Sequence, residues 1–414
     1  MSHTSFRRGI RNTVFLFGGN AISAATSFVI TIYIARSLSL SDFGSYITVI
    51  AFVTLFSILT DFGINAAIIS EGAKNPEDTH NLIFSSMGLK FLMSLATMFV
   101  VIVFALFTPY SLEVKVLIVV MSVTLVMGGI GSLFSVVFNI YQDMKYISII
   151  QIAERITFAT LAFVFLIVGL GVPGVILAII IAAFVSLMLN FVNSRRIHYY
   201  KLNFKPIFNP AILLSAVWIG ILLEFSTVWE SFTTAIISAF TNTTQVGLYT
   251  PAVNYVGVGD MAVIALMSAF SPIVSRAVSD RGISKKELFK YIGYFAVAGL
   301  VIVGITYAFG GQLMIFAFGP KFAESIVFIN ILVIGFAFYL ITIPTSMLLN
   351  VTKNQKMHIL SKTTLLWIGI PLVVILILRM GVIGAAYATT IAQSVEAVLS
   401  VSIALYVLKR SHYL

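Results

Sequence analysis

Twelve long apolar runs dominate the sequence and restrict it to a fold that lies within a membrane. Each run has about 20 residues or more, enough for an α-helix to cross roughly 30 Å of hydrocarbon. A helix satisfies its own backbone hydrogen bonds, as lipid requires. We therefore predict an all-α integral membrane protein with twelve transmembrane helices. The runs are residues 13–35, 45–69, 82–107, 114–138, 148–169, 174–193, 211–238, 249–273, 289–309, 324–349, 359–378 and 383–407.

Charged residues are too few to cover the surface of a soluble protein of 414 residues. They make up 10% of the chain, whose mean hydropathy is +1.06, whereas soluble proteins average about 25% charged residues. The net charge of +10 resembles that of nucleic-acid-binding proteins, but the charges lie in short clusters between the apolar runs. That placement is typical of membrane orientation. We expect membrane lipids as partners and no nucleic acid.

The distribution of basic residues predicts which ends face the cytoplasm. Of the 25 Lys and Arg residues, nineteen fall in the termini and alternate connections or at the adjoining run ends, four fall in the other connections or their run ends, and Lys90 and Arg155 lie well inside runs. Positive residues accumulate on the cytoplasmic side of membrane proteins. The bias predicts a multi-pass protein of the cell membrane with both termini in the cytoplasm.

Short motifs recur at equivalent helix ends, which indicates an internal repeat. Their offsets are 203, 211 and 210 residues, and the pairs are Phe43–Tyr46 with Val246–Tyr249, Asn139 with Asn350, and Gly171–Gly174 with Gly381–Gly384. Six helices per repeat preserve orientation, so the repeats are parallel. We predict six-helix lobes at 1–193 and 211–414, joined by a cytoplasmic linker at 194–210. Because the connections are too short for a catalytic domain, we expect a transporter rather than an enzyme.

Polar side chains inside the runs are the candidate site residues, because a charge facing lipid is costly. Two groups are predicted, and structural ion pairing is the alternative for their charged members. A buried carboxylate can exchange a proton or bind Na⁺. Without Cys or a metal-ligand cluster, we expect no metal or cofactor beyond coupling H⁺ or Na⁺. The predicted cavity residues are Asn20, Lys90, Gln151, Glu154, Arg155 and Gln393, and the predicted ion-coupling residues are Glu224, Glu230 and Glu396.

Four segments carry a resemblance to a known family. They are Ala35-Arg36-Ser37-Leu38-Ser39-Leu40-Ser41-Asp42-Phe43-Gly44-Ser45-Tyr46, Asp61-Phe62-Gly63-Ile64, Val246-Gly247-Leu248-Tyr249 and the turn from Asn350 to Lys356. With them the chain resembles the polysaccharide-exporter branch of the multidrug/oligosaccharidyl-lipid/polysaccharide flippase superfamily. The resemblance implies two lobes around a central cavity. It also implies transfer of a polyprenyl-(pyro)phosphate-linked oligosaccharide to the outer leaflet, with glycan-assembly proteins as candidate partners.

Two other functions are alternatives to a flippase. A cation-coupled multidrug or metabolite antiporter of the same fold would use Glu224 and Glu230. A membrane glycosyltransferase or polymerase would need a long catalytic loop or an acid/base pair at the interface, and the sequence shows neither. Lys90 and Arg155 favour an anionic cargo, because cationic side chains recognise phosphate. The preferred hypothesis is a flippase that works by alternating access.

Overall fold

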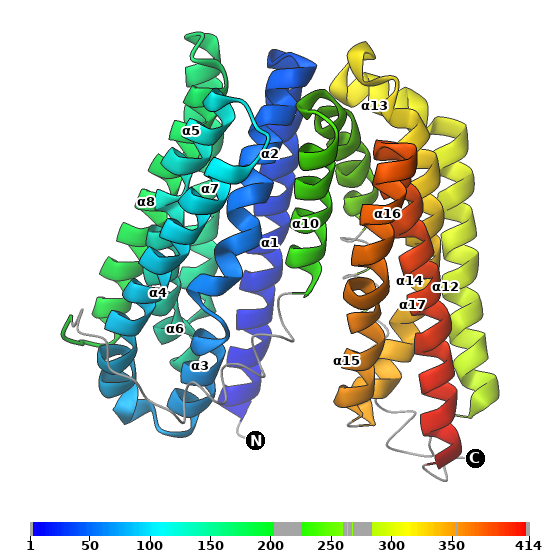
Figure 1. The fold of residues 1–414 in the computed structure, drawn as a ribbon. Helices are drawn as coiled ribbons and strands as arrows, with labels where there is room; N and C mark the ends of the chain where they lie inside the picture. The colour runs from blue at the N-terminus through cyan, green and yellow to red at the C-terminus, as the bar shows by residue number, and fades with distance from the viewer. Residues whose placement is uncertain are drawn as a thin grey trace. The chain divides into compact units, whose positions relative to one another are not determined.

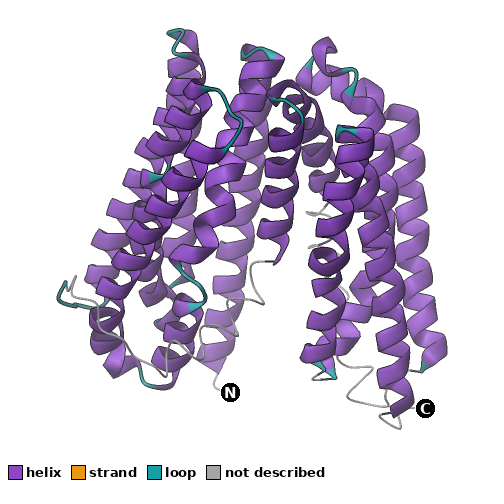
Figure 2. Ribbon diagram, in the orientation of Figure 1, coloured by secondary structure: helices purple, strands orange, loops and turns teal. Residues whose placement is uncertain are grey.

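The computed structural model describes residues 3–202, 225–259, 263, 267, 284–352 and 354–410. These residues form helices joined by short turns, and no strand occurs among them (Figures 1 and 2). The predicted all-α class is confirmed. The tertiary contacts divide the chain into unit 1, Met1–Phe232, and unit 2, Thr233–Leu414.

Unit 1 is built mainly from long helices (Figure 1). Helix α7 packs against α1 and α8, and α6 packs against α4 and α8. The helices are α1 (His3–Ser37), α2 (Leu40–Ser57), α3 (Ile64–Lys74), α4 (Thr79–Phe107), α5 (Leu112–Met121), α6 (Val123–Ile140), α7 (Met144–Ile167) and α8 (Gly171–Ile197), with the 3₁₀ turns η1 (Ile58–Thr60) and η2 (Pro76–Asp78).

Unit 2 contains two helical segments with π-type backbone, η3 and η5. Helix α14 packs against α12 and α17, and α17 also packs against α15 and α16. Helix α10 (Phe225–Phe240) crosses the division between the units, and residues 243–259 are also helical. The other elements are α12 (Lys285–Ile305), η3 (Thr306–Gly310), α13 (Gly311–Phe318), η4 (Pro320–Phe322), α14 (Ser325–Val351), α15 (Gln355–Thr364), η5 (Leu365–Gly369), α16 (Ile370–Met380) and α17 (Val382–Arg410).

Ten stretches of the described residues are long and apolar enough to cross a membrane, and they correspond to the first six and last four predicted runs. The other two runs, 211–238 and 249–273, lie partly outside the described residues. The predicted linker at 194–210 also runs into residues that are not described, so that boundary stays a prediction.

Helices α14 and α17 approach each other closely at Gly335. A Cβ atom at this position would overlap the side chain of Gln393 and lie 2.9 Å from the Cα of Thr390. The Thr390 hydroxyl donates a hydrogen bond of 2.9 Å to the carbonyl of Ile331 across the same interface. Small residues allow this close packing in membranes, where no hydrophobic force drives helices together.

Replacing Gly335 with Ala is expected to destabilise unit 2. The added methyl meets backbone, so the helices must separate, at a cost of about 1–3 kcal/mol. The matched control is Gly304→Ala in α12, where a Cβ would meet no heavy atom within 4 Å. Thermal unfolding of the purified protein in detergent should show a lower midpoint for G335A and an unchanged or higher one for G304A. Equal midpoints would contradict the close approach.

Candidate functional site

Helix α7 carries exposed polar side chains near its middle. Arg155 lies eleven residues from the start of α7 and twelve from its end. Both Arg155 and Gln151 are exposed, and Glu154 between them is half-buried. Among the described residues, none forms a hydrogen bond or ion pair with these three side chains. An Arg at the bilayer centre costs about 2.5–3.5 kcal/mol or more against lipid, so we expect this part of α7 to border water or a polar ligand.

Helix α1 packs against α7, runs parallel to it and carries a further exposed polar side chain. The Ser148 hydroxyl donates a hydrogen bond of 2.7 Å to the carbonyl of Phe15, and the rings of Tyr33 and Phe163 lie 4.8 Å apart. These contacts place exposed Asn20 at about the level of Gln151 along the helix pair. The predicted cavity residues of α1 and α7 therefore belong to one region of unit 1.

Lys90, by contrast, is fully buried inside unit 1 with an exposed fraction of 0%. Its ammonium donates hydrogen bonds to Asp61 Oδ1 at 2.6 Å, Asn65 Oδ1 at 2.8 Å and Ser132 Oγ at 3.0 Å. All three ammonium protons are thus used, and α4 is tied to α3, α6 and the turn before α3. A cargo could reach Lys90 only if this network opened, so its cavity role stays a prediction.

The same network explains the segment Asp61-Phe62-Gly63-Ile64 physically. Asp61 pairs with Lys90 and accepts a hydrogen bond of 3.1 Å from the Asn65 N–H at the start of α3. Gly63 has a φ of 85°, a left-handed conformation that glycine adopts without strain. Ile64 is buried in the apolar core shared by α3, α4 and α6. The segment therefore forms the turn before α3 and supplies the carboxylate that pairs with Lys90.

A second buried ion pair lies in unit 2, between α15 and α17. The ammonium of Lys362 is 2.7 Å from Glu396 Oε1 and 4.9 Å from the ring centroid of Tyr339 on α14. Glu396 is 1% exposed, whereas the side chain of Lys362 is 29% exposed. The sequence pattern singled out Glu396 but assigned Lys362 to a cytoplasmic connection. Its place within the apolar run 359–378 was the signal that could have identified it.

The remaining predicted residues contribute differently to the described structure. Gln393 is half-buried on α17 beside Gly335, where it takes part in helix packing. Glu224 and the side chain of Glu230 lie outside the described residues. Their predicted roles in ion coupling stay predictions.

A cluster of hydrogen-bonded residues lies at the end of α8 in unit 1. The Tyr141 hydroxyl donates to the carbonyl of Pro76 at 3.0 Å, so it accepts the 2.8 Å hydrogen bond from His198 Nδ1. Burial, aided by nearby His80, lowers the pKa of His198 and favours its neutral form. Burial also raises the pKa of Tyr200 to about 12. Tyr141, His198 and Tyr200 lie outside the spans.

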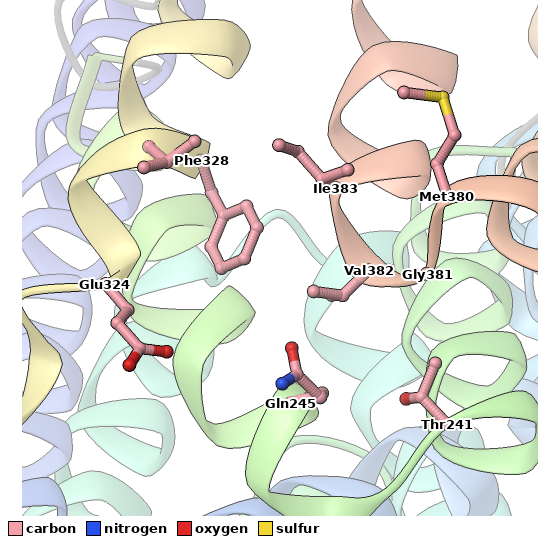
Figure 3. A pocket seen from close by; sticks show the side chains of 9 residues that line it. Thr241, Gln245, Glu324, Phe328, Met380, Gly381, Val382 and Ile383 are labelled. Atoms are coloured by element: carbon pink, nitrogen blue, oxygen red, sulfur yellow. The ribbon is translucent and has the colours of Figure 1, made fainter.

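Unit 2 also has a pocket of about 450 Å³ at the ends of its helices (Figure 3). Its polar side chains include Gln245 and Glu324, beside the apolar ring of Phe328. Met380 and Gly381 line it from the turn between α16 and α17. Because turn residues line it, the pocket lies at the level of the span ends rather than at mid-span.

Long apolar helices with a polar face and buried ion pairs define a multi-pass α-helical membrane protein. The family described as polysaccharide biosynthesis protein matches residues 10–278. The chain belongs to that family, which confirms the predicted family resemblance. No curated protein matches the sequence.

Solved structures of transporters share the fold over nearly the whole chain. The lipid II flippase MurJ, in an inward closed conformation, has a TM-score of 0.73 and 16% identity, covering 97% of this chain and 87% of that one. An inward-facing multidrug transporter of the MATE family gives 0.71 and 14%, covering 94% and 96%. A MOP superfamily transporter from Pyrococcus furiosus gives 0.63 and 13%, covering 97% and 95%. These likenesses confirm the predicted twelve-helix class of fold.

The hydrogen bonds of Lys90 predict how substitutions at Lys90 and Asp61 rank in their effect on thermal stability. Asp61→Asn leaves a sealed ammonium without its counter-ion, which costs about 3–5 kcal/mol. Lys90→Met removes the buried charge and leaves Asp61, whose side chain is 31% exposed, so it should cost less. Thermal unfolding should rank D61N below K90M, with the double variant D61N/K90M recovering part of the loss. The reverse order would show that Lys90 is not sealed within unit 1.

Proposed function

We propose that this protein is a flippase that moves a polyprenyl-(pyro)phosphate-linked oligosaccharide from the inner to the outer leaflet by alternating access. Membership of the polysaccharide biosynthesis family and the fold shared with a lipid II flippase support the proposal. The observation that carries it is the exposed Arg155 at the middle of α7, which has no hydrogen-bond or ion-pair partner among the described residues. An anionic headgroup is the natural partner of a guanidinium in that position.

The polar face of α1 and α7 gives the proposal a physical basis. The lipid tail of the cargo stays in hydrocarbon while its headgroup crosses beside polar side chains. Arg155 offers a planar fork that fits two phosphate oxygens. Asn20 and Gln151 offer amides, which donate and accept hydrogen bonds with sugar hydroxyls. The proposed step moves the cargo without breaking a covalent bond, so it needs no catalytic residue.

The proposal places the protein in the cell membrane with both termini in the cytoplasm. The nineteen-to-four bias of basic residues in the connections and termini supports this orientation. Coupling to H⁺ or Na⁺ is part of the proposal, with Glu224, Glu230 and Glu396 as candidates. Glycan-assembly proteins are proposed partners, since they would supply the cargo.

A cation-coupled multidrug or metabolite antiporter is the second candidate. The fold likeness to a MATE transporter, with a TM-score of 0.71, favours it as directly as the MurJ likeness favours a flippase. Such a protein would bind cationic cargo through carboxylates. The two candidates therefore differ in the charge of the transported molecule.

Transport by protein in liposomes distinguishes the two candidates. The wild type should speed exchange of a fluorescent polyprenyl-pyrophosphate sugar between leaflets. Arg155→Gln should slow this exchange at least about tenfold, because a hydrogen bond to a charged group contributes about 1.5–3 kcal/mol. The matched control is Arg196→Gln, at the exposed end of α8, which should transport like the wild type. Exchange no faster than in empty liposomes, together with transport of a cationic dye, would favour the antiporter.

A further inference from the structure

The two buried ion pairs present opposite charges to their surroundings. In unit 1 the lysine is sealed at 0% exposure and its partner Asp61 is 31% exposed. In unit 2 the carboxylate is sealed at 1% exposure and Lys362 is 29% exposed. A molecule that approaches the pair in unit 2 therefore meets an ammonium, whereas one that approaches the pair in unit 1 meets a carboxylate.

The two lysines also differ in how completely they are bonded. Lys90 donates three hydrogen bonds within unit 1. Among the described residues, Lys362 has an ion contact with Glu396, lies over the Tyr339 ring, and donates no hydrogen bond. A partly exposed ammonium with unused donors is able to bind a further anion, which a saturated one cannot do.

We propose that Lys362 is the anion-binding group of unit 2 and that the phosphate of the cargo replaces Glu396 as its counter-ion. This inference rests on the proposed function and names a residue that holds the headgroup. Tyr339 sits beside the ammonium and offers an aromatic face next to the bound phosphate. The ligand class is an organic phosphate or pyrophosphate within the span.

The exchange has a consequence for Glu396, which lies at the centre of α17, fourteen residues from either end. Neither of its oxygens receives a hydrogen bond from the described residues. If the phosphate takes Lys362, the sealed carboxylate is left without a cation, and taking up a proton relieves that cost. Binding of one anion would then take up one proton at the carboxylate, which would couple cargo binding to protons at a single site.

The groups around Glu396 favour this exchange. The described titratable groups near the pair are Lys362 and His358 on α15 and Tyr339 on α14. None of them is an alternative permanent cation for the carboxylate. The π-type segment η5 (Leu365–Gly369) directly follows α15, and Pro371 lies at the start of α16. Segments of this kind interrupt a helix locally and often accompany functional sites.

The charge swap K362E/E396K tests the proposal, because it keeps an ion pair but presents a carboxylate where the ammonium stood. The probe is farnesyl pyrophosphate, titrated calorimetrically into detergent-solubilised protein at one fixed pH. Using two buffers with different ionisation enthalpies also gives the number of protons taken up. We expect K362Q and the swap to lose at least about tenfold in affinity. E396Q should bind at least as tightly as the wild type, with about one proton fewer taken up.

Controls separate binding from folding and from the proposed function. Lys409→Gln, at the exposed end of α17, should bind like the wild type, and thermal unfolding should show that the swap folds. Wild-type affinity in the folded swap, or unchanged proton uptake in E396Q, would overturn the inference. If the wild type still transports the lipid-linked sugar, the proposed function survives that result. If the wild type neither binds farnesyl pyrophosphate nor transports the sugar, both proposals fail.

Discussion

The cost of an ionised side chain in hydrocarbon is the constraint on which the interior of both units depends. A charge within a span is tolerated when it is paired inside the protein or when it borders water. Lys90 and Glu396 are paired inside the protein, each with an oppositely charged partner in its own unit. Arg155 is exposed and has no ion-pair partner among the described residues, so we propose that it borders water. Charge placement thus separates Lys90, which holds unit 1 together, from Arg155, which is exposed on α7.

Hydropathy was sufficient to predict the helical class and the ten described spans, because each span alone must exceed a fixed length. Hydropathy could not distinguish polar residues that are buried between helices from polar residues that are exposed. Lys90, Ser94 and Thr97 share a helix face that turns out to be buried against other helices of unit 1. Asn20 on α1, by contrast, is exposed. Helical periodicity gives the direction of a face and says nothing about what covers it.

The partners of the buried charges were also beyond the sequence pattern, since they come from other helices. Asp61 is 29 residues before Lys90 and meets it only because a turn at Gly63 redirects the chain. Lys362 is 34 residues before Glu396, and it was counted with neighbouring basic residues rather than as part of its span. The asymmetry that results, with an exposed carboxylate in one unit and an exposed ammonium in the other, is a property of tertiary structure.

The proposed transport requires that the polar face of α1 and α7 borders water within the membrane. The chain has no Cys, so Gln151→Cys, one turn before Arg155, introduces a single thiol on this face. In sealed vesicles a membrane-impermeant thiol reagent should modify Q151C, and farnesyl pyrophosphate should slow the reaction. Phe99→Cys, at a 67% exposed apolar position of α4, should react only with a lipid-soluble reagent. If Q151C were sealed from the impermeant reagent on both sides of the membrane, the polar face of α1 and α7 would not border water.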